Sequence, residues 1–285
     1  MPMRRRRHLF EFEDLSWCPG WIRRGITDLL HYQLSRYGLY RPIAPRLARL
    51  MRETGQHELL DLCSGSAGPV VTLLPALDEA AGRSVRVTLS DRFPNLEAFR
   101  ALAAAHPNLS YRADAVDATA VPSGLPGVRT VFTAFHHFPP SLARAILADA
   151  VRTGQPLAVF EFTERTWVNA VKSLVLGPLL VALDTPLMRP VRLWRLVLTF
   201  LVPLIPLAYA WDAFASHMRT YSPEELRRLL DGLESPGYAW EVGQTQERVL
   251  GYRITYLIGK PVAAPELAAM PHQADPAPPP GSPAT

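Results

Sequence analysis

The sequence predicts an α/β domain built on a seven-strand, mostly parallel sheet. Between residues 57 and 164, short apolar runs alternate with helical stretches, a rhythm typical of a parallel sheet with helices on both faces. Two further apolar runs, 239–244 and 252–258, are separated only by residues 245–251. A connection this short requires an antiparallel hairpin. A chain of 285 residues is long enough to bury a substantial core.

The parallel part is expected to contain five strands, each an apolar run that ends in a turn. They span residues 58–63, 85–90, 109–113, 128–133 and 157–162. Helical spacing of apolar residues follows the first strand to about Ala80, returns near Leu96–Ala105 and again over Ser141–Val151. This order of elements is the reason for placing the core of the domain at residues 57–164.

Residues 1–56 are expected to form a helical cap. Apolar residues recur at helical spacing over Ile22–Leu30 and again over Leu47–Met51. Pro42 and Pro45 interrupt the pattern, so two or three short helices are expected in place of one long helix.

Charge and cysteine content argue against several classes of protein. The formal charge of +4 equals the charge of Arg4–Arg7, which leaves 4 − 4 = 0 for the rest of the chain. No nucleic-acid partner is expected, because nucleic-acid binders carry their basic excess on a folded face. Three acids within Glu11–Asp14 follow the arginine run and exclude an apolar export segment. Cys18 and Cys63 predict neither a disulfide framework nor a structural metal, which favours a cytoplasmic location.

Residues 165–212 are expected to form an apolar helical insertion. Its stretches Ser173–Leu183 and Leu196–Trp211 contain no charged residue. The sixteen residues of the second stretch would reach about 24 Å as a helix, short of the ~30 Å hydrocarbon core of a membrane. Pro203 and Pro206 would also break that helix. We therefore expect no membrane-spanning helix.

Three interpretations of the insertion stay open: ordinary core helices, a lid over a hydrophobic acceptor, or a peripheral contact of residues 167–211 with a membrane surface. The last is favoured by Arg189, Arg192 and Arg195, whose spacing would place them on one helical face beside the apolar run. A lid and a membrane contact both imply an oily acceptor, such as a lipid, an isoprenoid or a polyketide.

Residues 213–260 are expected to return to the sheet domain and complete it with the hairpin. Ser222 would cap a helix there, with Pro223 at its first position and Glu225 completing a capping box. Residues 261–285 contain eight prolines and cannot bury enough apolar surface to offset their ordering entropy, so they are expected to form a disordered tail.

A turn of small residues, Ser64–Gly68, follows the first strand. Small residues let the backbone approach a ligand closely, and the next helix offers free N–H groups. A nicotinamide nucleotide site would show Gly-x-Gly-x-x-Gly and an acid about 20 residues later. Here only Gly65 and Gly68 are present, and Asp91 lies 26 residues beyond Gly65. The dinucleotide fingerprint therefore fits poorly.

The stretch Asp61–Gly68 resembles the first motif of the class I S-adenosylmethionine-dependent methyltransferases, acid-x-Gly-x-Gly-x-Gly. The likeness includes an acid that ends the second strand, Asp91, an acid after the third strand, Asp114, and the terminal hairpin. It covers roughly residues 58–162 and 212–260. The resemblance implies a Rossmann-like fold, S-adenosylmethionine as cofactor and methyl transfer as the reaction.

The resemblance also implies the residues that bind the cofactor: Asp61, Cys63, Gly65, Asp91, Arg92, Asp114, Ala115 and Ala134. Asp61 would accept a hydrogen bond from the methionine ammonium, Gly65 would lie under the cofactor, and Asp91 would bind both ribose hydroxyls. Cys63 and Ala67 depart from the family motif, where they replace the first and third glycines.

For the adenine, the resemblance implies a hydrogen bond from its amine to Asp114 and one from the backbone N–H of Ala115, with Asp117 as the alternative to Asp114. One acid at the end of a strand is often only a turn former or a helix cap. Three such acids on successive strands favour a ligand site, since ligands of parallel sheets bind outside the carboxyl ends of the strands.

Methyl transfer requires in-line alignment and, for an oxygen or nitrogen acceptor, a base. His136 and His137 follow the fourth strand, where this fold faces the transferable methyl, and one of them is a candidate base. Glu161 in the fifth strand is the second candidate. Each also has a structural interpretation, as a backbone-bonded, surface or internally satisfied polar residue.

We therefore expect a methyltransferase that acts on a small hydrophobic acceptor. The first alternative is a module that keeps the cofactor pocket but has lost catalysis and works at a membrane surface or on a partner protein, an alternative supported by Cys63 and Ala67. The second alternative, a nicotinamide-dependent reductase, is disfavoured by the missing third glycine.

Overall fold

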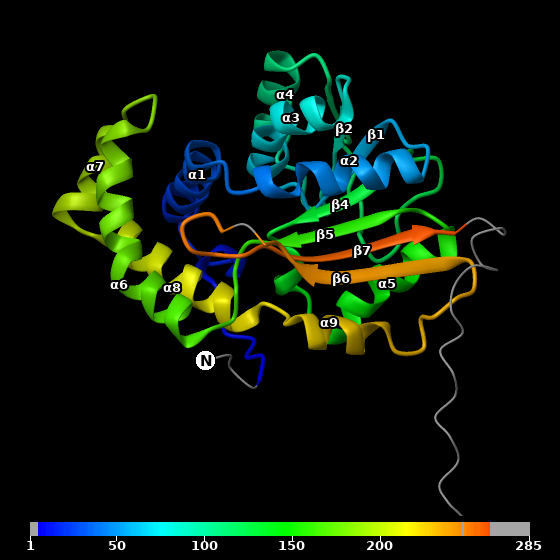
Figure 1. The fold of residues 1–285 in the computed structure, drawn as a ribbon. Helices are drawn as coiled ribbons and strands as arrows, with labels where there is room; N and C mark the ends of the chain where they lie inside the picture. Colours follow the sequence, from blue (N-terminus) through cyan, green and yellow to red (C-terminus); the bar gives the residue numbers. More distant parts are fainter. Residues whose placement is uncertain (1–4, 247, 263–285) are drawn as a thin grey trace, which may run out of the picture.

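A seven-strand sheet runs through the centre of the computed structural model (Figure 1). The order is β3-β2-β1-β4-β5-β7-β6; β1 to β5 are parallel, and β7 is antiparallel to both β5 and β6. The strands are β1 Glu58–Leu62, β2 Arg86–Leu89, β3 Leu109–Tyr111, β4 Val128–Phe132, β5 Leu157–Glu161, β6 Tyr238–Gln244 and β7 Thr255–Pro261. The predicted mostly parallel sheet with an antiparallel terminal hairpin is confirmed.

The structure describes residues 5–246 and 248–262. Most of the proline-rich tail predicted at 261–285 and the first of the four N-terminal arginines lie outside these residues. β7 extends to Pro261, which pairs with Tyr238. It also begins later than predicted, because Tyr252 pairs with Val249 in a separate turn.

Helices cover both faces of the sheet (Figure 1). One layer contains α2 Ala44–Glu53, α3 Gly68–Ala81 and α4 Leu96–Ala105, and the other contains α5 Pro140–Thr153 and α9 Pro223–Leu230. Every residue of β4 and β5 is buried, as expected for parallel strands covered on two sides. The helix α9 begins with the predicted capping box, in which the Ser222 hydroxyl accepts from the Glu225 N–H and the Glu225 carboxylate accepts from the Ser222 N–H.

The N-terminal region is helical, as predicted. It contains α1 Gly20–Tyr37 and α2, separated by the 3₁₀ turn Arg41–Ile43, and a shorter 3₁₀ turn Phe12–Asp14 precedes them. Pro42 lies in the turn and Pro45 at the start of α2, so both prolines stand where a helix begins. Residues 5–15, here called the N-terminal strap, lie against the insertion, where Arg7 donates its N–H to the Met218 carbonyl.

The insertion projects from the carboxyl end of β5 as a helical lobe (Figure 1). It comprises α6 Trp167–Asp184, the 3₁₀ turn Thr185–Leu187, α7 Leu193–Leu196, the π-helical turn Val197–Leu201 and α8 Leu204–Arg219. The chain bends by 76° between Leu201 and Leu204, at the predicted proline break, whereas Pro206 lies in the first turn of α8 and does not interrupt it.

The helix Trp167–Leu187, 21 residues with a mean hydropathy of 1.5, is by length and composition long and apolar enough to cross a membrane, because it extends beyond its uncharged run. The absence of a membrane-spanning helix stays a prediction. One prediction about the insertion was wrong. The predicted arginine face does not form, since residues 189–192 precede α7 and Arg195 is buried and bonded to Asp28 on α1 at 2.7 Å.

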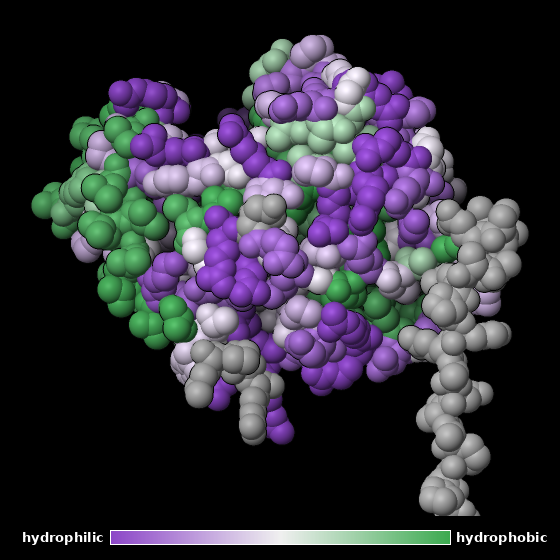
Figure 2. Space-filling view, in the orientation of Figure 1, coloured by the Kyte–Doolittle hydropathy of each residue, from purple (hydrophilic) through white to green (hydrophobic). Residues whose placement is uncertain are grey.

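The lobe exposes a continuous apolar surface (Figure 2). We call it the apolar face. Its exposed residues are Trp167, Val168, Val171, Leu174, Val175, Leu176, Leu179, Leu183, Leu187, Val191, Leu193, Val197, Phe200, Leu201, Val202, Leu204 and Leu207. Soluble monomeric proteins rarely expose a contiguous apolar patch of this extent.

Candidate functional site

Three alternate residues of the turn after β1 have a left-handed backbone conformation. Cys63, Gly65 and Ala67 have φ angles of 58°, 53° and 56°. Glycine adopts this conformation freely, whereas other residues lose roughly 1–2 kcal/mol each. The turn therefore keeps the shape that glycines favour although Cys63 and Ala67 replace two of them. Left-handed residues held in place by their surroundings are concentrated at ligand sites.

Asp61 holds this turn from inside the sheet. Its carboxylate is buried and accepts hydrogen bonds from the hydroxyls of Ser64 at 2.7 Å and Thr130 at 2.8 Å. Burial raises the pKa of Asp61 to about 7, although both hydrogen bonds act in the opposite direction. In the described part of the chain it forms no ion pair, so a cation placed at this turn would meet a buried carboxyl that lacks a positive partner.

Asp91 lies at the end of β2 beside the same turn. Its carboxylate accepts from the backbone N–H of Gly65 at 2.9 Å and of Phe93 at 2.8 Å. A Cβ added at Gly65 would meet no atom within 4 Å, so the space next to the turn is open. Burial, together with the charges of Asp91, Asp61 and Asp117, raises the pKa of the Cys63 thiol. Asp61, Asp91 and Asp117 are thus close enough to the turn after β1 to affect Cys63, whereas Asp114, the third of the predicted strand-end acids, is not among these charges.

Asp114 and Asp117, the two candidates for binding the adenine amine, have different surroundings in the structure. The Asp114 side chain is 86% exposed, and its ion pair within the described residues is with Arg112, at 3.4 Å. Asp117 pairs with Arg92 at 3.3 Å and is close enough to Cys63 to influence its pKa. Asp117 therefore lies nearer than Asp114 to the turn after β1. Arg92 forms its ion pair with Asp117. The neighbouring Ala115 is exposed.

A further left-handed residue, Thr133 with a φ of 50°, directly follows β4. Its hydroxyl shares a short hydrogen bond with that of Tyr40. Ala134 follows it, half-buried, and leads into the 3₁₀ turn Phe135–His137. β1 and β4 are neighbours at the point where the strand order reverses, so Cys63 and Thr133 border the crevice in which open parallel sheets bind ligands.

His136 and Glu161 form a buried pair. Glu161 accepts the His136 backbone N–H at 3.0 Å with one oxygen and lies 2.8 Å from His136 Nδ1 with the other. Both carboxylate oxygens of Glu161 thus contact His136, so the two residues hold each other at two points. The side chain of His136 is 1% exposed and its Nε2 has no hydrogen-bond partner.

His137 lies beside His136, with ring centroids 4.3 Å apart. Its Nδ1 is 2.9 Å from Asp14. Burial lowers the pKa of His137, but the hydrogen bond to Asp14 and the charges of Glu11 and Asp14 outweigh it and raise the pKa to about 9. In this state His137 carries a proton at pH 7, which disfavours it as the base.

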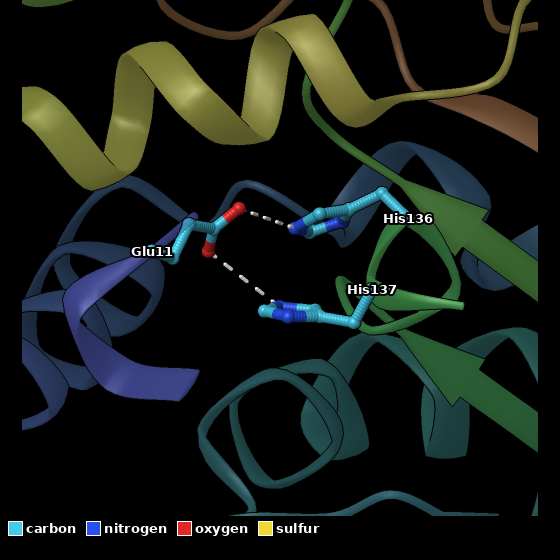
Figure 3. Close-up of side chains that lie close together, drawn as sticks. All are labelled: Glu11, His136 and His137. Atoms are coloured by element: carbon cyan, nitrogen blue, oxygen red, sulfur yellow. Dashed lines mark ion pairs between the residues drawn. The ribbon is translucent and has the colours of Figure 1, made fainter. Parts of the chain in front are cut away.

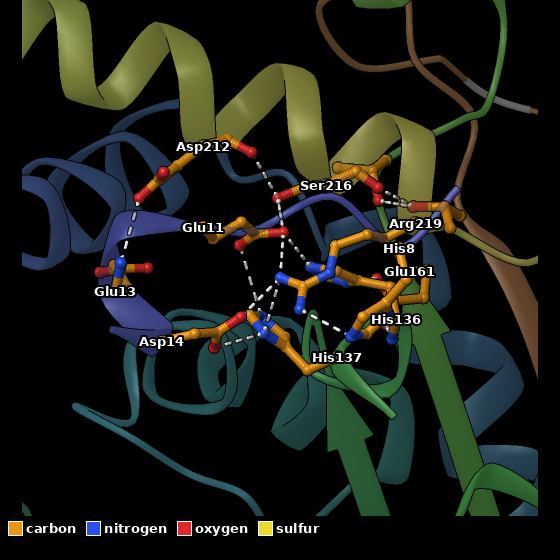
Figure 4. Close-up of polar contacts among 12 residues, drawn as sticks. His8, Glu11, Glu13, Asp14, His136, His137, Glu161, Asp212, Ser216 and Arg219 are labelled. Carbon is orange, nitrogen blue, oxygen red and sulfur yellow. Dashed lines mark hydrogen bonds and ion pairs between the residues drawn. The ribbon is translucent and has the colours of Figure 1, made fainter. Parts of the chain in front are cut away.

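Sequence reasoning missed the partners of these histidines. The Glu11 carboxylate faces the edges of both rings, with one oxygen 3.6 Å from His136 Nε2 and the other 3.7 Å from His137 Nε2 (Figure 3). Arg219 on α8 pairs with Glu11 at 2.8 Å and with Asp14 at 2.6 Å (Figure 4). In the sequence, the only local signal that the acids of the strap could be functional is their density, three within Glu11–Asp14.

A cavity of about 370 Å³ lies between α1, α6, α8 and the ends of β4 and β5. Apolar side chains such as Ile26, Leu30, Phe162 and Leu180 form much of its wall, and Thr133 reaches it from β4.

The polar lining of this cavity includes Glu11, Glu13, Asp212 and His217. Burial raises the pKa of Asp212 to about 7, raises that of Glu13 and lowers that of His217 to about 4. The cavity therefore has a mostly apolar wall and, at one end, polar groups that accept protons.

Comparison with known proteins identifies the fold. No family model matches the chain, and no curated protein matches its sequence. The solved structure of the plantazolicin methyltransferase BpumL in complex with SAH is similar over 86% of this chain and 92% of that chain, with a TM-score of 0.53 and 11% identity. The fold is that of the class I S-adenosylmethionine-dependent methyltransferases. A second BpumL structure, with a monoazolic desmethylPZN analog and SAH, covers 84% of this chain and 90% of that chain at a TM-score of 0.52 and 8% identity.

Proposed function

We propose that this protein transfers the methyl group of S-adenosylmethionine to a small acceptor with an apolar body. The observation that carries the proposal is the cavity, which reaches Thr133 at the end of β4, next to the left-handed turn after β1. A cofactor at the crevice and an acceptor in the cavity would therefore meet at one place, which is the alignment that methyl transfer requires.

The residues around the turn after β1 fit S-adenosylmethionine as the cofactor. Asp61 is a buried carboxyl near which a positive group of the cofactor would be stabilised, and the open space at Gly65 admits a ligand. Asp91 keeps acceptor capacity for ribose hydroxyls, since a carboxylate has about four lone-pair sites and two are used. When bound, the cofactor supplies an electrophilic methyl on a sulfonium. The protein would supply orientation and a site for the displaced proton.

The polar end of the cavity favours an acceptor with a hydroxyl or amine at one end of an apolar body. Asp212 is the lining group best matched to take its proton, because a base is most effective when its pKa lies near the working pH. His136 Nε2 is the other candidate, but His136 is buried beside the cavity and is not among the lining residues.

We further propose that the apolar face contacts an anionic membrane surface from which the acceptor enters. Leu176 and Leu179 line the cavity and are also 41% and 55% exposed, so the cavity wall continues onto the apolar face. Arg189 and Arg192 are exposed in the connection beside it, and arginines next to an apolar surface are attracted to anionic headgroups. An oily acceptor could then pass from lipid to cavity without crossing water.

Calorimetric titration of the purified protein with S-adenosylmethionine, S-adenosylhomocysteine and NADH tests the cofactor. We expect micromolar binding of the first two and none of NADH; binding of neither sulfur compound would refute the proposal. Turnover to S-adenosylhomocysteine with hydrophobic alcohols, amines and lipid extracts tests the reaction. Cofactor binding without turnover on any of them would favour a catalytically silent module.

Cosedimentation with phosphatidylglycerol-containing liposomes tests the membrane contact. We expect binding at low salt that weakens at high salt and is reduced in a Leu201→Asp variant. Leu142→Asp is the matched control, because Leu142 is equally apolar, 42% exposed and lies on α5, outside the apolar face. Equal losses in both variants, or no binding at low salt, would leave the insertion as a lid.

A further inference from the structure

Glu11, His136 and His137 converge on one point although they come from the N-terminal strap and the turn after β4 (Figure 3). One ligand atom from each residue, a carboxylate oxygen and two imidazole nitrogens, lies within 4.8 Å of the others. All three side chains face inward, and those of Glu11 and His136 are 2% and 1% exposed.

The separations are too long for hydrogen bonds, and one ligand atom from each residue lies within 4.8 Å of the other two. Glu11 approaches the two rings with different oxygens, Oε1 toward His136 and Oε2 toward His137. The Glu11 oxygens lie 3.6 Å from His136 Nε2 and 3.7 Å from His137 Nε2, and contacts of this length are not hydrogen bonds. Ligand atoms about 2.1 Å from a tetrahedral metal are about 3.4 Å from each other. His136 Nε2 is buried without any hydrogen-bond partner, which is unfavourable unless something else occupies its lone pair.

The opposite sides of the two imidazoles are held as metal ligands usually are. His136 Nδ1 lies 2.8 Å from Glu161, and His137 Nδ1 lies 2.9 Å from Asp14. A metal-binding histidine characteristically donates its second N–H to a carboxylate, which fixes the tautomer and directs the free nitrogen at the ion. Here Glu161 and Asp14 are the carboxylates that hold the two Nδ1 atoms. They turn Nε2 of His136 and Nε2 of His137 toward the carboxylate of Glu11.

Arg219 and Ser216 complete the surroundings of Glu11. Arg219 Nη1 lies 2.8 Å from Glu11 Oε1, and the Ser216 hydroxyl donates to the same oxygen at 3.2 Å. These contacts orient the carboxylate so that Oε2 faces His137. The shell contains the carboxylates of Glu11, Asp14 and Glu161 and the positive charge of Arg219, and a bound metal ion would replace the proton that His137 carries at pH 7. Arg6 contributes a further positive charge, but its guanidinium points at the carbonyls of residues 136 and 138.

We propose that Glu11, His136 and His137 bind a divalent first-row transition metal ion of the Zn²⁺ or Fe²⁺ class. Two imidazoles and one carboxylate suit these ions, whereas Mg²⁺ and Ca²⁺ prefer oxygen ligands throughout. Three protein ligands leave a coordination position open. Because Glu11 also lines the cavity, that position is within reach of a heteroatom on a molecule bound there. The metal site does not depend on methyl transfer.

The test uses the full chain, stripped with a chelator and titrated with Co²⁺ and Zn²⁺. We expect one equivalent of Co²⁺ to bind at micromolar concentration or tighter, with visible d–d absorption that Zn²⁺ displaces. His137→Gln and Glu11→Gln should each weaken binding at least 10-fold. Glu161→Gln, which leaves all three ligands in place, should weaken it about 10- to 100-fold, as loss of an outer carboxylate does.

His57→Gln is the control for adventitious binding, because His57 is an exposed histidine in the loop before β1. It should bind Co²⁺ as the unmodified chain does. The metal would also join the N-terminal strap to the end of β4, so Zn²⁺ should raise the unfolding temperature of the unmodified protein and of His57→Gln, but not of His137→Gln.

Two outcomes would overturn the proposal. One is no stoichiometric binding of Co²⁺ or Zn²⁺ at 100 µM; the other is affinity that is unchanged in both His137→Gln and Glu11→Gln. Either result would mean that the cluster is a closed ion-pair network around Arg219. Calorimetric binding of S-adenosylmethionine, measured on the same variants, keeps a failure of this proposal distinct from a failure of the proposed function.

Discussion

Gly65→Ala is the sharpest test of the cofactor position, because stability and binding should respond to it differently. Gly65 has a φ of 53° and an added Cβ would meet nothing within 4 Å. The substitution therefore costs only the left-handed backbone penalty, about 1 kcal/mol. For a domain of this size that corresponds to a fall of about 2–4 °C in the unfolding temperature. The fold should otherwise be kept.

The new methyl group would project into the open space beside the turn, where we place the cofactor. We expect the affinity for S-adenosylmethionine to fall at least ~10-fold, equivalent to about 1.4 kcal/mol. The backbone N–H of Gly65 remains able to donate to Asp91, so the loss would be steric and would not come from a broken turn.

Gly55→Ala is the matched control. Gly55 has a φ of 64°, and its added Cβ would also meet nothing within 4 Å, but it lies in the turn after α2. Differential scanning fluorimetry should show the same small loss of stability in both variants, whereas calorimetry should show weaker cofactor binding only in Gly65→Ala. Unchanged affinity in Gly65→Ala would refute the placement of the cofactor over the first turn.

Two further predictions concern Asp61 and the cap of α9. Because burial raises the pKa of Asp61 from 3.8 to about 7, its ionisation opposes folding, and the unfolding free energy should fall as pH rises from about 4 to about 7. A positive cofactor favours the carboxylate, so its affinity should rise with pH up to about 7 and then level off; calorimetry at pH 6, 7 and 8 should show a slope that Asp61→Asn removes. Ser222→Ala removes the acceptor for the Glu225 N–H and should lower the unfolding free energy in urea by about 1 kcal/mol. Ser222→Thr should retain most of that stability, and an equal loss in both variants would contradict the capping interpretation.

The strands and helices of the sheet domain could be predicted because their signals are local. Each parallel strand is a short apolar run that ends in turn-forming residues, and α4 begins and ends where its apolar spacing does. The break before α8 and the capping box of α9 depend on residues within one turn of each other. The hairpin strand β7 was misplaced at its start, because the pairing of Val249 with Tyr252 ends the loop later than the apolar run does.

The candidate site was predictable only in part. Asp61, Asp91 and the small-residue turn share a recognisable spacing, whereas the choice between Asp114 and Asp117 required their surroundings, which differ in exposure and in ion pairing. Arg195 was assigned to a surface face, but α1 supplies its partner Asp28 from far along the sequence.

The sequence by itself determined the order of the strands and helices, the turn after β1 and the strand-end acids, because backbone geometry and burial impose a period on neighbouring residues. Only the tertiary structure decided that Glu11 faces both His136 and His137 and that Arg219 orients it. The sequence around each of these residues does not indicate which residues it contacts. The contacts join positions more than a hundred residues apart, so they depend on how the strap, the sheet and α8 pack together. Local periodicity predicts the elements, and packing selects which side chains meet.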